Sequence, residues 1–382
     1  MKIYITGDNI ISSLGFTTEE NMDNIFNGVT GIHKLDSGYL SPEAFPAALV
    51  DSKRLTELFN NTNPGTYTRL EQMMILSIKQ AVEKAGLDME NSRTLLIIST
   101  TKGNVELLEN EKKDKFPADR VYLWGLAKVI SDYFKLSQRP LIISNACISG
   151  LLAIEVGARL IRNKQYDHVI IAGGDILTPF VVSGFQSFKS LSSEPCKPYD
   201  AARDGLSLGE ACATIVLSSQ KQALRDQLTI EVSGGASSND ANHISGPSRT
   251  GDGLYLSIKN ALASAKMTAG EIDFICAHGT ATPYNDDMES KAVNLAGMQN
   301  VPLNSLKGYI GHTLGAAGTI ESIMSIHGIL HQKLIKTLGF STLGVAEPIN
   351  VTSETKSCKL NNCLKVASGF GGCNAAVIFS VV

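Results

Sequence analysis

Residues 141–151 read Leu-Ile-Ile-Ser-Asn-Ala-Cys-Ile-Ser-Gly-Leu, an apolar run that leads directly into a segment of helical character. Cys147 stands at the junction, where a strand would pass the chain to the first turn of a helix. The unpaired N–H groups of a helix start carry partial positive charge, which favours the thiolate form of a cysteine. The stretch therefore predicts a nucleophile, although a cysteine that merely packs in the core is the commoner arrangement.

β-Branched runs alternate with amphipathic segments along the first half of the chain. Short apolar runs bounded by polar turns are typical of buried strands. The pattern predicts strands at 94–99, 141–144 and 168–174 and helices near 70–86 and 150–163. Further along, a segment rich in Ser, Gly and Asn from 233 to 253 predicts a long loop. We therefore expect an α/β fold.

Two similarities within the chain suggest a duplicated unit. Residues 77–82 (Ser-Ile-Lys-Gln-Ala-Val) resemble residues 257–262 (Ser-Ile-Lys-Asn-Ala-Leu). More weakly, Cys147-Ile-Ser-Gly resembles His312-Thr-Leu-Gly. A duplicated α/β unit would explain both similarities, and chance likeness between helical segments is the alternative. In a duplicated fold, Cys147 and His312 would start equivalent helices and face each other across a pseudo-twofold axis.

Length and composition define the class of protein. The 382 residues are 43% hydrophobic, which is enough for a large core. The net charge of −3 and the scattered basic residues provide no footprint for nucleic acid. No apolar run reaches the length of a membrane span, and the seven cysteines suggest no disulfide framework. We expect a cytoplasmic protein with neither nucleic-acid nor membrane partners.

Two histidines stand in glycine-containing turns. His278 begins the run His-Gly-Thr-Ala-Thr-Pro after a predicted strand, where a structural hydrogen-bonding role is an equal alternative to a functional one. His312 lies in Gly-His-Thr-Leu-Gly, where glycines allow the backbone to approach a ligand closely. Neither histidine belongs to a His-x-x-x-His pattern, and the cysteines show no CxxC spacing, so no metal site is expected.

A glycine-rich loop, Gly369-Phe370-Gly371-Gly372, precedes the last predicted strand. It lacks the GxGxxG and Walker patterns of phosphate-binding loops, and one aromatic residue among glycines suits a mobile gate. A thiol at a helix start, two histidines in glycine-containing turns and a phenylalanine between glycines together suit thioester chemistry. Acyl transfer needs donors at an oxyanion, and decarboxylation of a malonyl group needs donors at an enolate, which two neutral histidines can supply.

Five segments carry a resemblance that covers nearly the whole chain. In order they are Asn145-Ala146-Cys147; Lys197-Pro198-Tyr199-Asp200 with Arg203-Asp204-Gly205; His278-Gly279-Thr280-Ala281-Thr282-Pro283; Lys307 with Gly311-His312; and Gly369-Phe370-Gly371-Gly372. By these motifs the chain resembles the elongating (type I/II) β-ketoacyl-acyl-carrier-protein synthases of the thiolase-like superfamily. The resemblance implies a thiolase-like fold in which two pseudo-symmetric halves form αβαβα layers. Residues 1–225 would carry Cys147, and residues 226–382 would carry His278 and His312.

The resemblance also implies an activity, the decarboxylative Claisen condensation of an acyl thioester with malonyl-acyl-carrier protein. Cys147 would take the acyl group from a carrier-protein thioester while its own N–H and that of Phe370 form the oxyanion hole. His278 and His312 would bind the malonyl carbonyl, promote loss of CO2 and stabilise the enolate. The β-ketoacyl product would belong to fatty-acid or to polyketide or polyene chain elongation.

Further residues receive supporting roles from the resemblance. They are Lys307 paired with Glu321 to orient the catalytic groups, Asp286 and Glu289 for structural polar contacts, Thr280 and Thr282 for the phosphopantetheine arm, and Phe185 with Phe370 for the acyl pocket. The basic side chains of Arg69 and Lys189 are expected to contact the acidic acyl carrier protein, although most such surface charges are merely solvated. Phosphopantetheine arrives on that carrier, so no bound cofactor is expected. A homodimer or a heterodimer is the expected assembly.

Some residues depart from the pattern of the family. Val366-Ala367-Ser368 replaces the usual Asn-Ser-Phe before the glycine loop, and Cys373 stands where a hydroxyl residue is usual. One alternative is a non-catalytic subunit like a chain-length factor, but such subunits characteristically lose the nucleophile. Another alternative is a thiolase-type acyltransferase, for which Cys373 would be the second catalytic cysteine. His312 argues against an initiating synthase, which uses His and Asn.

Overall fold

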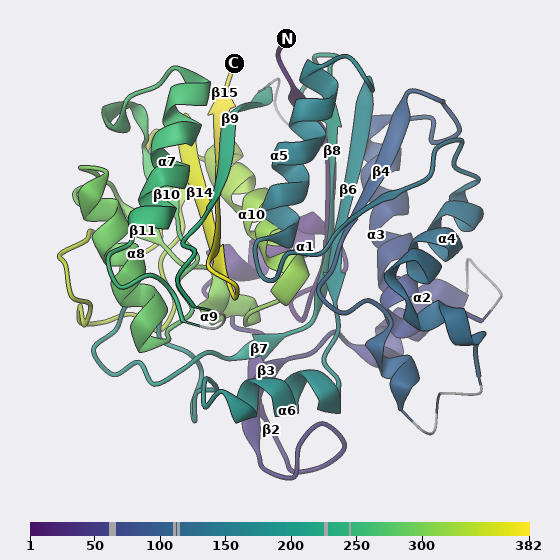
Figure 1. Cartoon of the computed structure of the whole chain (residues 1–382), viewed down its shortest axis with the longest axis horizontal. Helices are drawn as coiled ribbons and strands as arrows, with labels where there is room; N and C mark the ends of the chain where they lie inside the picture. Colours follow the sequence, from purple (N-terminus) through teal and green to yellow (C-terminus); the bar gives the residue numbers. More distant parts are fainter. Residues whose placement is uncertain (61–65, 110–111, 113–114, 225–227, 244–245) are drawn as a thin grey trace.

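The structure, a computed structural model, is built around a ten-stranded sheet (Figure 1). The two halves of the sheet enclose a pair of helices, and further helices cover their outer faces. It describes residues 1–60, 66–109, 112, 115–224, 228–243 and 246–382. The predicted boundary between 225 and 226 lies at residues 225–227, outside the described residues.

The strands of this sheet fall into two sets of five. The first set is β1 (Tyr4–Ile11), β4 (Thr94–Ser99), β5 (Leu141–Ile143), β6 (His168–Asp175) and β8 (Ala211–Ser218), and the second is β9 (Ile230–Asn239), β10 (Phe274–Cys276), β11 (Leu303–Asn304), β14 (Asn362–Gly369) and β15 (Cys373–Val381). The spatial order is β11-β10-β14-β15-β9-β1-β8-β6-β4-β5. Outward from the β9–β1 junction, each set runs first, fifth, fourth, second, third, with two antiparallel pairings followed by two parallel ones. This shared topology confirms the two pseudo-symmetric halves.

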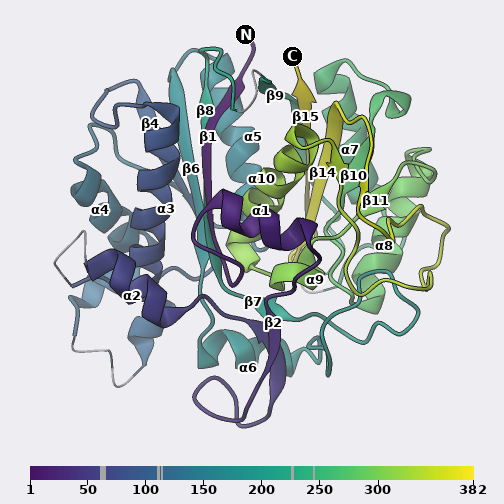
Figure 2. The same ribbon diagram turned by 180° about the vertical axis from the view of Figure 1, so that it is seen from behind.

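Six helices complete the layers. They are α3 (Arg69–Ala85) and α4 (Leu123–Phe134) outside the first half, α7 (Asp252–Ala265) and α8 (Pro283–Leu295) outside the second half, and α5 (Ser149–Arg162) and α10 (Ala317–Leu330) in the centre. Figure 2 shows α10 between the two halves of the sheet, with α3 and α4 at one side and α8 at the other. The largest apolar cluster includes the buried faces of α5 and α10, and separate clusters lie under α3 and α7. The αβαβα layering is therefore confirmed.

The remaining elements surround this core. They are α1 (Thr18–Phe26), α2 (Ser52–Asn60), α6 (Pro179–Ser187) and α9 (Lys307–Ile310), the short 3-10 helices η1 (Val105–Leu108), η2 (Ala118–Val121), η3 (Ala269–Glu271) and η4 (Leu314–Ala316), and the minor strands β2 (Ile32–Leu35), β3 (Phe45–Ala48), β7 (Leu208–Gly209), β12 (Lys333–Leu334) and β13 (Lys356–Ser357). Within the described part of the chain, no helix combines the length and apolarity needed to cross a bilayer.

Local sequence explains most element boundaries. The helix predicted near 70–86 is α3, which begins with a capping box between Thr68 and Glu71 and ends at Gly86 in the left-handed conformation (φ 59°). The loop predicted from 233 is wrong at its beginning, because residues 230–239 form β9 and pair along β15. Small residues are required there: a Cβ on Gly234 would lie 2.5 Å from the Ala261 carbonyl oxygen of α7.

The two central helices meet at their N-terminal ends, and glycine makes this close approach possible. A Cβ on Gly318 would lie 2.2 Å from the Leu151 nitrogen, and a Cβ on Gly150 would lie 2.6 Å from the Thr319 nitrogen. The segments that precede α5 and α10 are therefore held side by side. These segments carry Cys147 and His312, which come from opposite halves of the chain.

Candidate active site

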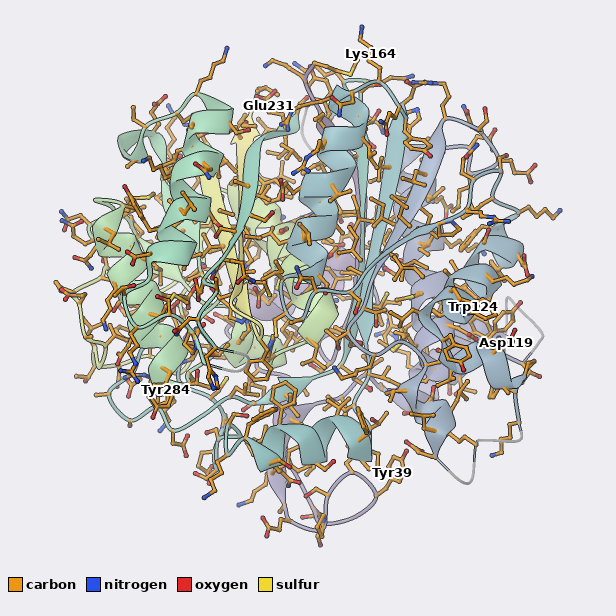
Figure 3. All side chains as sticks on the ribbon, viewed as in Figure 1. Tyr39, Asp119, Trp124, Lys164, Glu231 and Tyr284 are labelled. Carbon is orange, nitrogen blue, oxygen red and sulfur yellow. The ribbon has the colours of Figure 1, made fainter. Side chains whose placement is uncertain are left out.

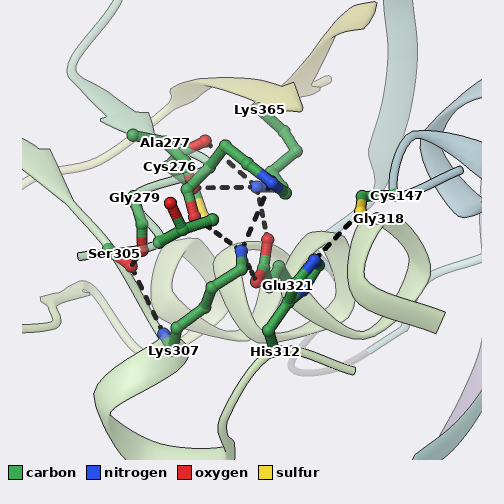
Figure 4. A network of polar contacts seen from close by, with 12 residues as sticks. Cys147, Cys276, Ala277, Gly279, Ser305, Lys307, His312, Gly318, Glu321 and Lys365 are labelled. Atoms are coloured by element: carbon green, nitrogen blue, oxygen red, sulfur yellow. Dashed lines mark hydrogen bonds and ion pairs between the residues drawn. The ribbon is translucent and has the colours of Figure 1, made fainter. Parts of the chain in front are cut away.

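Cys147 lies between the edge strand β5 and the first turn of α5. Ala146, immediately before it, adopts φ 44°, a left-handed conformation that non-glycine residues rarely occupy and that marks a strained turn. The tight turn leaves the thiol buried, at 7% exposure, and directs it toward the second half of the chain. There the Cys147 Sγ contacts the His312 Nε2 at 3.0 Å (Figure 4).

His312 is held in the turn between α9 and η4. Its backbone N–H donates to the Ser207 carbonyl at 2.7 Å. The preceding residue must be glycine, because Gly311 adopts φ 68° and a Cβ there would lie 2.5 Å from the Leu208 carbonyl oxygen. The His312 Nδ1 is buried and has no hydrogen-bond partner among the described residues. No contact among the described residues therefore fixes which of the two His312 ring nitrogens carries the proton.

His278 follows β10 and approaches the same point from another direction. The ring centroids of His278 and His312 are 5.2 Å apart, with planes nearly perpendicular at 87°. The His278 Nδ1 lies 3.4 Å from the Lys307 Nζ, which carries only donors as an ammonium. The His278 Nδ1 therefore accepts, and its Nε2 carries the proton and acts as a donor.

A buried network of charged side chains supports these groups (Figure 4). The Lys307 Nζ donates to the Glu321 Oε1 at 2.6 Å and to the His278 carbonyl. The other carboxylate oxygen of Glu321, Oε2, lies 2.6 Å from the Lys365 Nζ, an ion pair whose angles depart from those of a hydrogen bond. All three charged side chains are buried. The network thus fixes the ammonium that orients His278.

Burial sets the protonation of the three reactive groups. It lowers the pKa of His278 and His312 well below the ordinary histidine value, and the charge of Lys307 lowers both further. Burial raises the pKa of the Cys147 thiol to about 12, with a smaller contribution from Cys373. The helix start alone predicts a thiolate, and this expectation is wrong for the resting protein because burial outweighs it. At neutral pH both rings and the thiol are uncharged.

Cys147, His278 and His312 place their side-chain S and N atoms within 4.8 Å of one another. By distance alone these three atoms could surround a metal ion. The same spacing suits a single carbonyl group, because two imidazole N–H donors and one sulfur nucleophile then reach neighbouring atoms of one thioester. The sequence prediction of no metal site stays a prediction.

The glycine loop closes the site from one side. A Cβ on Gly369 would lie 3.0 Å from the Cys147 nitrogen, so the absence of a side chain brings this loop against the Cys147 amide. The Phe370 ring is 38% exposed and stacks on Phe185 at 6.0 Å between centroids. Phe188 packs on the same ring at 5.2 Å. The predicted gate residue therefore lines the same pocket as Cys147 and packs against two other aromatic rings.

The residues that depart from the family pattern hold this loop locally. The Ser368 hydroxyl donates to the Asn374 Oδ1 at 2.7 Å, and the Cys373 thiol contacts the Phe370 carbonyl at 3.3 Å. Burial raises the pKa of the Cys373 thiol to about 11. The Cys373 thiol thus supports the turn of the glycine loop, and its alternative role as a second catalytic cysteine stays a prediction.

A pocket of about 290 Å³ leads from the surface to the three reactive groups. Its lining includes Thr280 and Thr282, whose hydroxyl oxygens lie 2.9 Å apart, together with Phe185, Phe188 and Phe370. Tyr284 lies at its rim and projects into solvent at the start of α8 (Figure 3). The pocket lining thus combines hydroxyl groups with aromatic rings around the three reactive groups.

Asp286 and Glu289, both on α8, hold the turn that carries His278. The Glu289 carboxylate accepts from the N–H groups of His278 and Gly279, each at 2.7 Å. Asp286 accepts from the N–H groups of Thr280 and Tyr199. Burial raises the pKa of both carboxyl groups, that of Asp286 to about 7. These side chains do not line the pocket, and they position residues that do.

The two basic residues predicted to contact a carrier protein differ in their surroundings. The Arg69 side chain points inward: it is 23% exposed, pairs with the buried Glu210 and donates to the Val50 carbonyl and the Ser52 hydroxyl. The Arg69 guanidinium is thus engaged in an ion pair within the chain, and its contact with a carrier protein stays a prediction. Lys189 is exposed and follows Phe188 at the pocket rim, so it is still a candidate.

Two residues of the site were absent from the sequence prediction, and each left a signal. Lys365 is the only charged residue in the apolar run Asn362–Gly369. Such a charge in a central strand predicts a buried ion pair. Phe188 follows Phe185 by three residues, a spacing that places both rings on one side of a helix end.

Comparisons with known proteins agree with this geometry. The model of the beta-ketoacyl synthase N-terminal domain matches residues 1–223, and that of the C-terminal domain matches residues 229–341. A putative mitochondrial 3-oxoacyl-[acyl-carrier-protein] synthase of Schizosaccharomyces pombe is 29% identical over 99% of this chain and 98% of its own. A 3-oxoacyl-[acyl-carrier-protein] synthase 2 of Vibrio cholerae is also 29% identical, with the same coverage.

Solved structures show the same fold. A chain from the complex of the ketosynthase ApeO with its chain length factor ApeC from Xenorhabdus doucetiae has a TM-score of 0.88 at 26% identity, covering 100% of this chain and 98% of its own. A chain of the ishigamide ketosynthase/chain length factor has a TM-score of 0.89 at 26% identity, covering 99% and 98%. The thiolase-like fold of the ketosynthases is thereby confirmed. With both of its domain models matched, the chain belongs to the beta-ketoacyl synthase family.

Proposed function

We propose that this protein catalyses decarboxylative condensation, joining an acyl group held on Cys147 to a malonyl unit that arrives on acyl carrier protein. The observation that carries the proposal is the buried, uncharged set of Cys147, His278 and His312, reached through a pocket from the surface. Neutral imidazoles next to a thiol provide one proton acceptor for acyl transfer and two N–H donors for an enolate.

The first step is acyl transfer. The Cys147 Sγ attacks the thioester carbonyl of the acyl donor while its proton passes to the His312 Nε2, 3.0 Å away. The N–H groups of Cys147 and Phe370 stabilise the oxyanion. The C–S bond to the carrier then breaks, and its thiolate takes the proton from His312 as it leaves. Acyl transfer thus leaves His312 neutral, and tautomeric exchange at its unpaired Nδ1 lets Nε2 carry a proton.

The second step is decarboxylation. Nε2–H groups of His278 and His312 donate to the thioester carbonyl of the malonyl unit. The bond to the carboxylate breaks, CO2 leaves, and the electron pair forms an enolate that these donors stabilise. The enolate carbon attacks the carbonyl of the acyl-Cys147, the C–S bond breaks, and the Cys147 thiolate takes a proton from solvent. The β-ketoacyl group stays on the carrier protein that brought the malonyl unit.

The carrier protein is proposed as the partner at the pocket rim, with Lys189 as a contact for its acidic surface. The phosphopantetheine arm would extend past Thr280 and Thr282 toward Cys147. Cytoplasmic location is also proposed, because all seven cysteines are free thiols and reducing compartments keep thiols in this state.

A second polypeptide is proposed to pair with the edge strand β5, either another copy of this chain or a related subunit. β5 ends the sheet, and Leu141 on it is 42% exposed. Trp124, at the start of α4, is 54% exposed (Figure 3). An exposed apolar sheet edge favours pairing with another strand. Two of the structurally similar chains come from ketosynthase and chain-length-factor pairs, which supports a heterodimer as one of the two assemblies. The oligomer is tested by light scattering on the purified chain, where twice the mass of 40.9 kDa indicates a homodimer.

The activity is tested in two half-reactions. Incubation with acyl-acyl-carrier protein should give an acyl adduct on Cys147 by mass spectrometry, and incubation with malonyl-acyl-carrier protein should release CO2. The Cys147→Ala variant should lose the adduct. A wild-type protein that forms no adduct and releases no CO2 contradicts the enzyme proposal and favours the non-catalytic subunit.

A further inference from the structure

Lys365 is a fully buried ammonium that the proposed reaction does not use. It lies in β14, with 0% of its surface exposed. Its Nζ donates to three backbone carbonyls, those of Val366 at 2.8 Å, Ala277 at 3.1 Å and Cys276 at 3.4 Å. Figure 4 shows Lys365 with Cys276, Ala277 and its ion-pair partner Glu321. Four oxygen atoms from three elements thus surround one nitrogen.

Burying such a charge is unfavourable, and well-packed apolar residues often replace a buried ion pair without loss of stability. Stability alone therefore does not account for this lysine. Lys307 and Lys365 place two ammonium groups on the single carboxylate of Glu321, beside the two histidines. The position of Lys365 next to the turn that carries His278 indicates an effect on the site.

The contacts of Lys365 join three parts of the site. Cys276 is the last residue of β10, and Ala277 connects it to His278. Glu321, on α10, receives Lys307 on its other oxygen, and Lys307 orients the His278 ring. Val366 lies on β14, which leads into the glycine loop. A single ammonium therefore links the His278 backbone, the partner of its ring and the strand that carries the gate.

We propose that Lys365 is a positioning residue for decarboxylation, which holds His278 and the Lys307–Glu321 pair in the arrangement that binds the malonyl carbonyl. This inference rests on the proposed function and names a residue that supports its second step. Lys365 itself touches neither substrate nor the reacting atoms. Its own contacts do not include Cys147, so acyl transfer depends on it much less than decarboxylation does.

The positive charge of Lys365 also helps to keep the two histidine rings neutral. The pKa of both histidines is lowered first by burial, then by Lys307, and Lys365 contributes to each as well. Burial opposes the charge of Lys365, but the Glu321 carboxylate beside it offsets this, and the pKa of Lys365 is raised. The side chain is therefore an ammonium throughout the neutral range.

The test compares the two half-reactions in Lys365→Ala and in a matched control, Lys259→Ala, which removes an exposed lysine on α7. Loss of fixed positioning should slow malonyl decarboxylation by about 10²-fold. Acylation of Cys147 should stay within about threefold of wild type, which also shows that the variant is folded. Added ammonium should restore part of the decarboxylation in Lys365→Ala by occupying the four-oxygen cavity, and tetramethylammonium, which is too large, should not.

Each outcome has a defined meaning. Slow decarboxylation with normal acylation and ammonium rescue supports the proposal. Wild-type decarboxylation in Lys365→Ala overturns it, and so does an equal loss of both half-reactions that ammonium does not restore, because that pattern indicates a merely structural lysine. If the wild-type protein lacks both half-reactions, the proposed function fails and Lys365 is not the cause.

Discussion

Glu289→Gln is the substitution whose effect the structure defines most closely. The carboxylate is buried and receives four donors: the N–H groups of His278 and Gly279 at 2.7 Å, the Asn285 Nδ2 at 2.8 Å and the Tyr199 hydroxyl at 3.0 Å. A glutamine has the same shape but must direct its NH2 at one side of this set. In either orientation at least one backbone N–H of the His278 turn then faces another donor.

The expected loss of stability follows from the one hydrogen bond that a glutamine at this position cannot accept. A hydrogen bond to a charged group contributes about 1.5–3 kcal/mol, so the absence of one bond and the repulsion that replaces it should lower the free energy of unfolding by about 2–3 kcal/mol. The His278 turn also shifts, and a misplacement of the order of 1 Å should slow malonyl decarboxylation by about 10²-fold. Acylation of Cys147 should change little, because His312 is held by Ser207 instead.

The assay pairs urea denaturation with the two half-reactions, using the exposed Glu354→Gln as a control of the same chemical change. Glu354→Gln should match the wild type in all three measurements. If Glu289→Gln unfolds at the wild-type urea concentration and decarboxylates malonyl-acyl-carrier protein at the wild-type rate, the role of Glu289 in positioning His278 is refuted.

Three further predictions concern packing, protonation and the gate. Gly318→Ala should lower the free energy of unfolding by about 1–3 kcal/mol in urea denaturation, because its Cβ would lie 2.2 Å from a backbone nitrogen of α5; wild-type stability would contradict the close approach of the central helices. Alkylation of Cys147 by iodoacetamide should rise about tenfold per pH unit from pH 7 to 9, because the raised pKa of about 12 leaves the thiolate scarce; a plateau below pH 9 would show a lower pKa. Phe370→Ala removes the ring that stacks between Phe185 and Phe188, so acyl-Cys147 should hydrolyse faster by mass spectrometry, and an unchanged lifetime would argue against a gate.

The sequence predicted the regular parts of the first half well, because buried parallel strands there are continuous apolar runs. β4, β5 and β6 and the helices α3 and α5 lie within a residue or two of their predicted bounds. β9 was missed because its pairing with β15 and its contact with α7 favour Gly and Ser, residues that in isolation indicate a loop. Tertiary contact outweighs local propensity at such a position.

The catalytic residues of the site could be predicted from their residue types. The protonation and direction of side chains could not, because these depend on the surrounding residues. The meeting of Cys147 and His312 follows from the repeated topology, and the structure brings their side chains together. The thiolate expected at a helix start depends on burial, which the sequence does not specify. The sequence shows that Arg69 is charged, but the direction of its side chain depends on Glu210, which is far away in sequence. Lys365 could be identified as a site residue only after the apolar residues around it had been recognised as a buried strand.

The most direct test of the central claim is a single-turnover experiment on the acyl-enzyme. Protein carrying an acyl group on Cys147 is mixed with malonyl-acyl-carrier protein, and intact masses of both proteins are followed over time. We expect the adduct to leave Cys147 as CO2 is released and a β-ketoacyl group of the combined length to appear on the carrier protein. An adduct that persists on Cys147, or is lost only as free acid, would contradict this expectation.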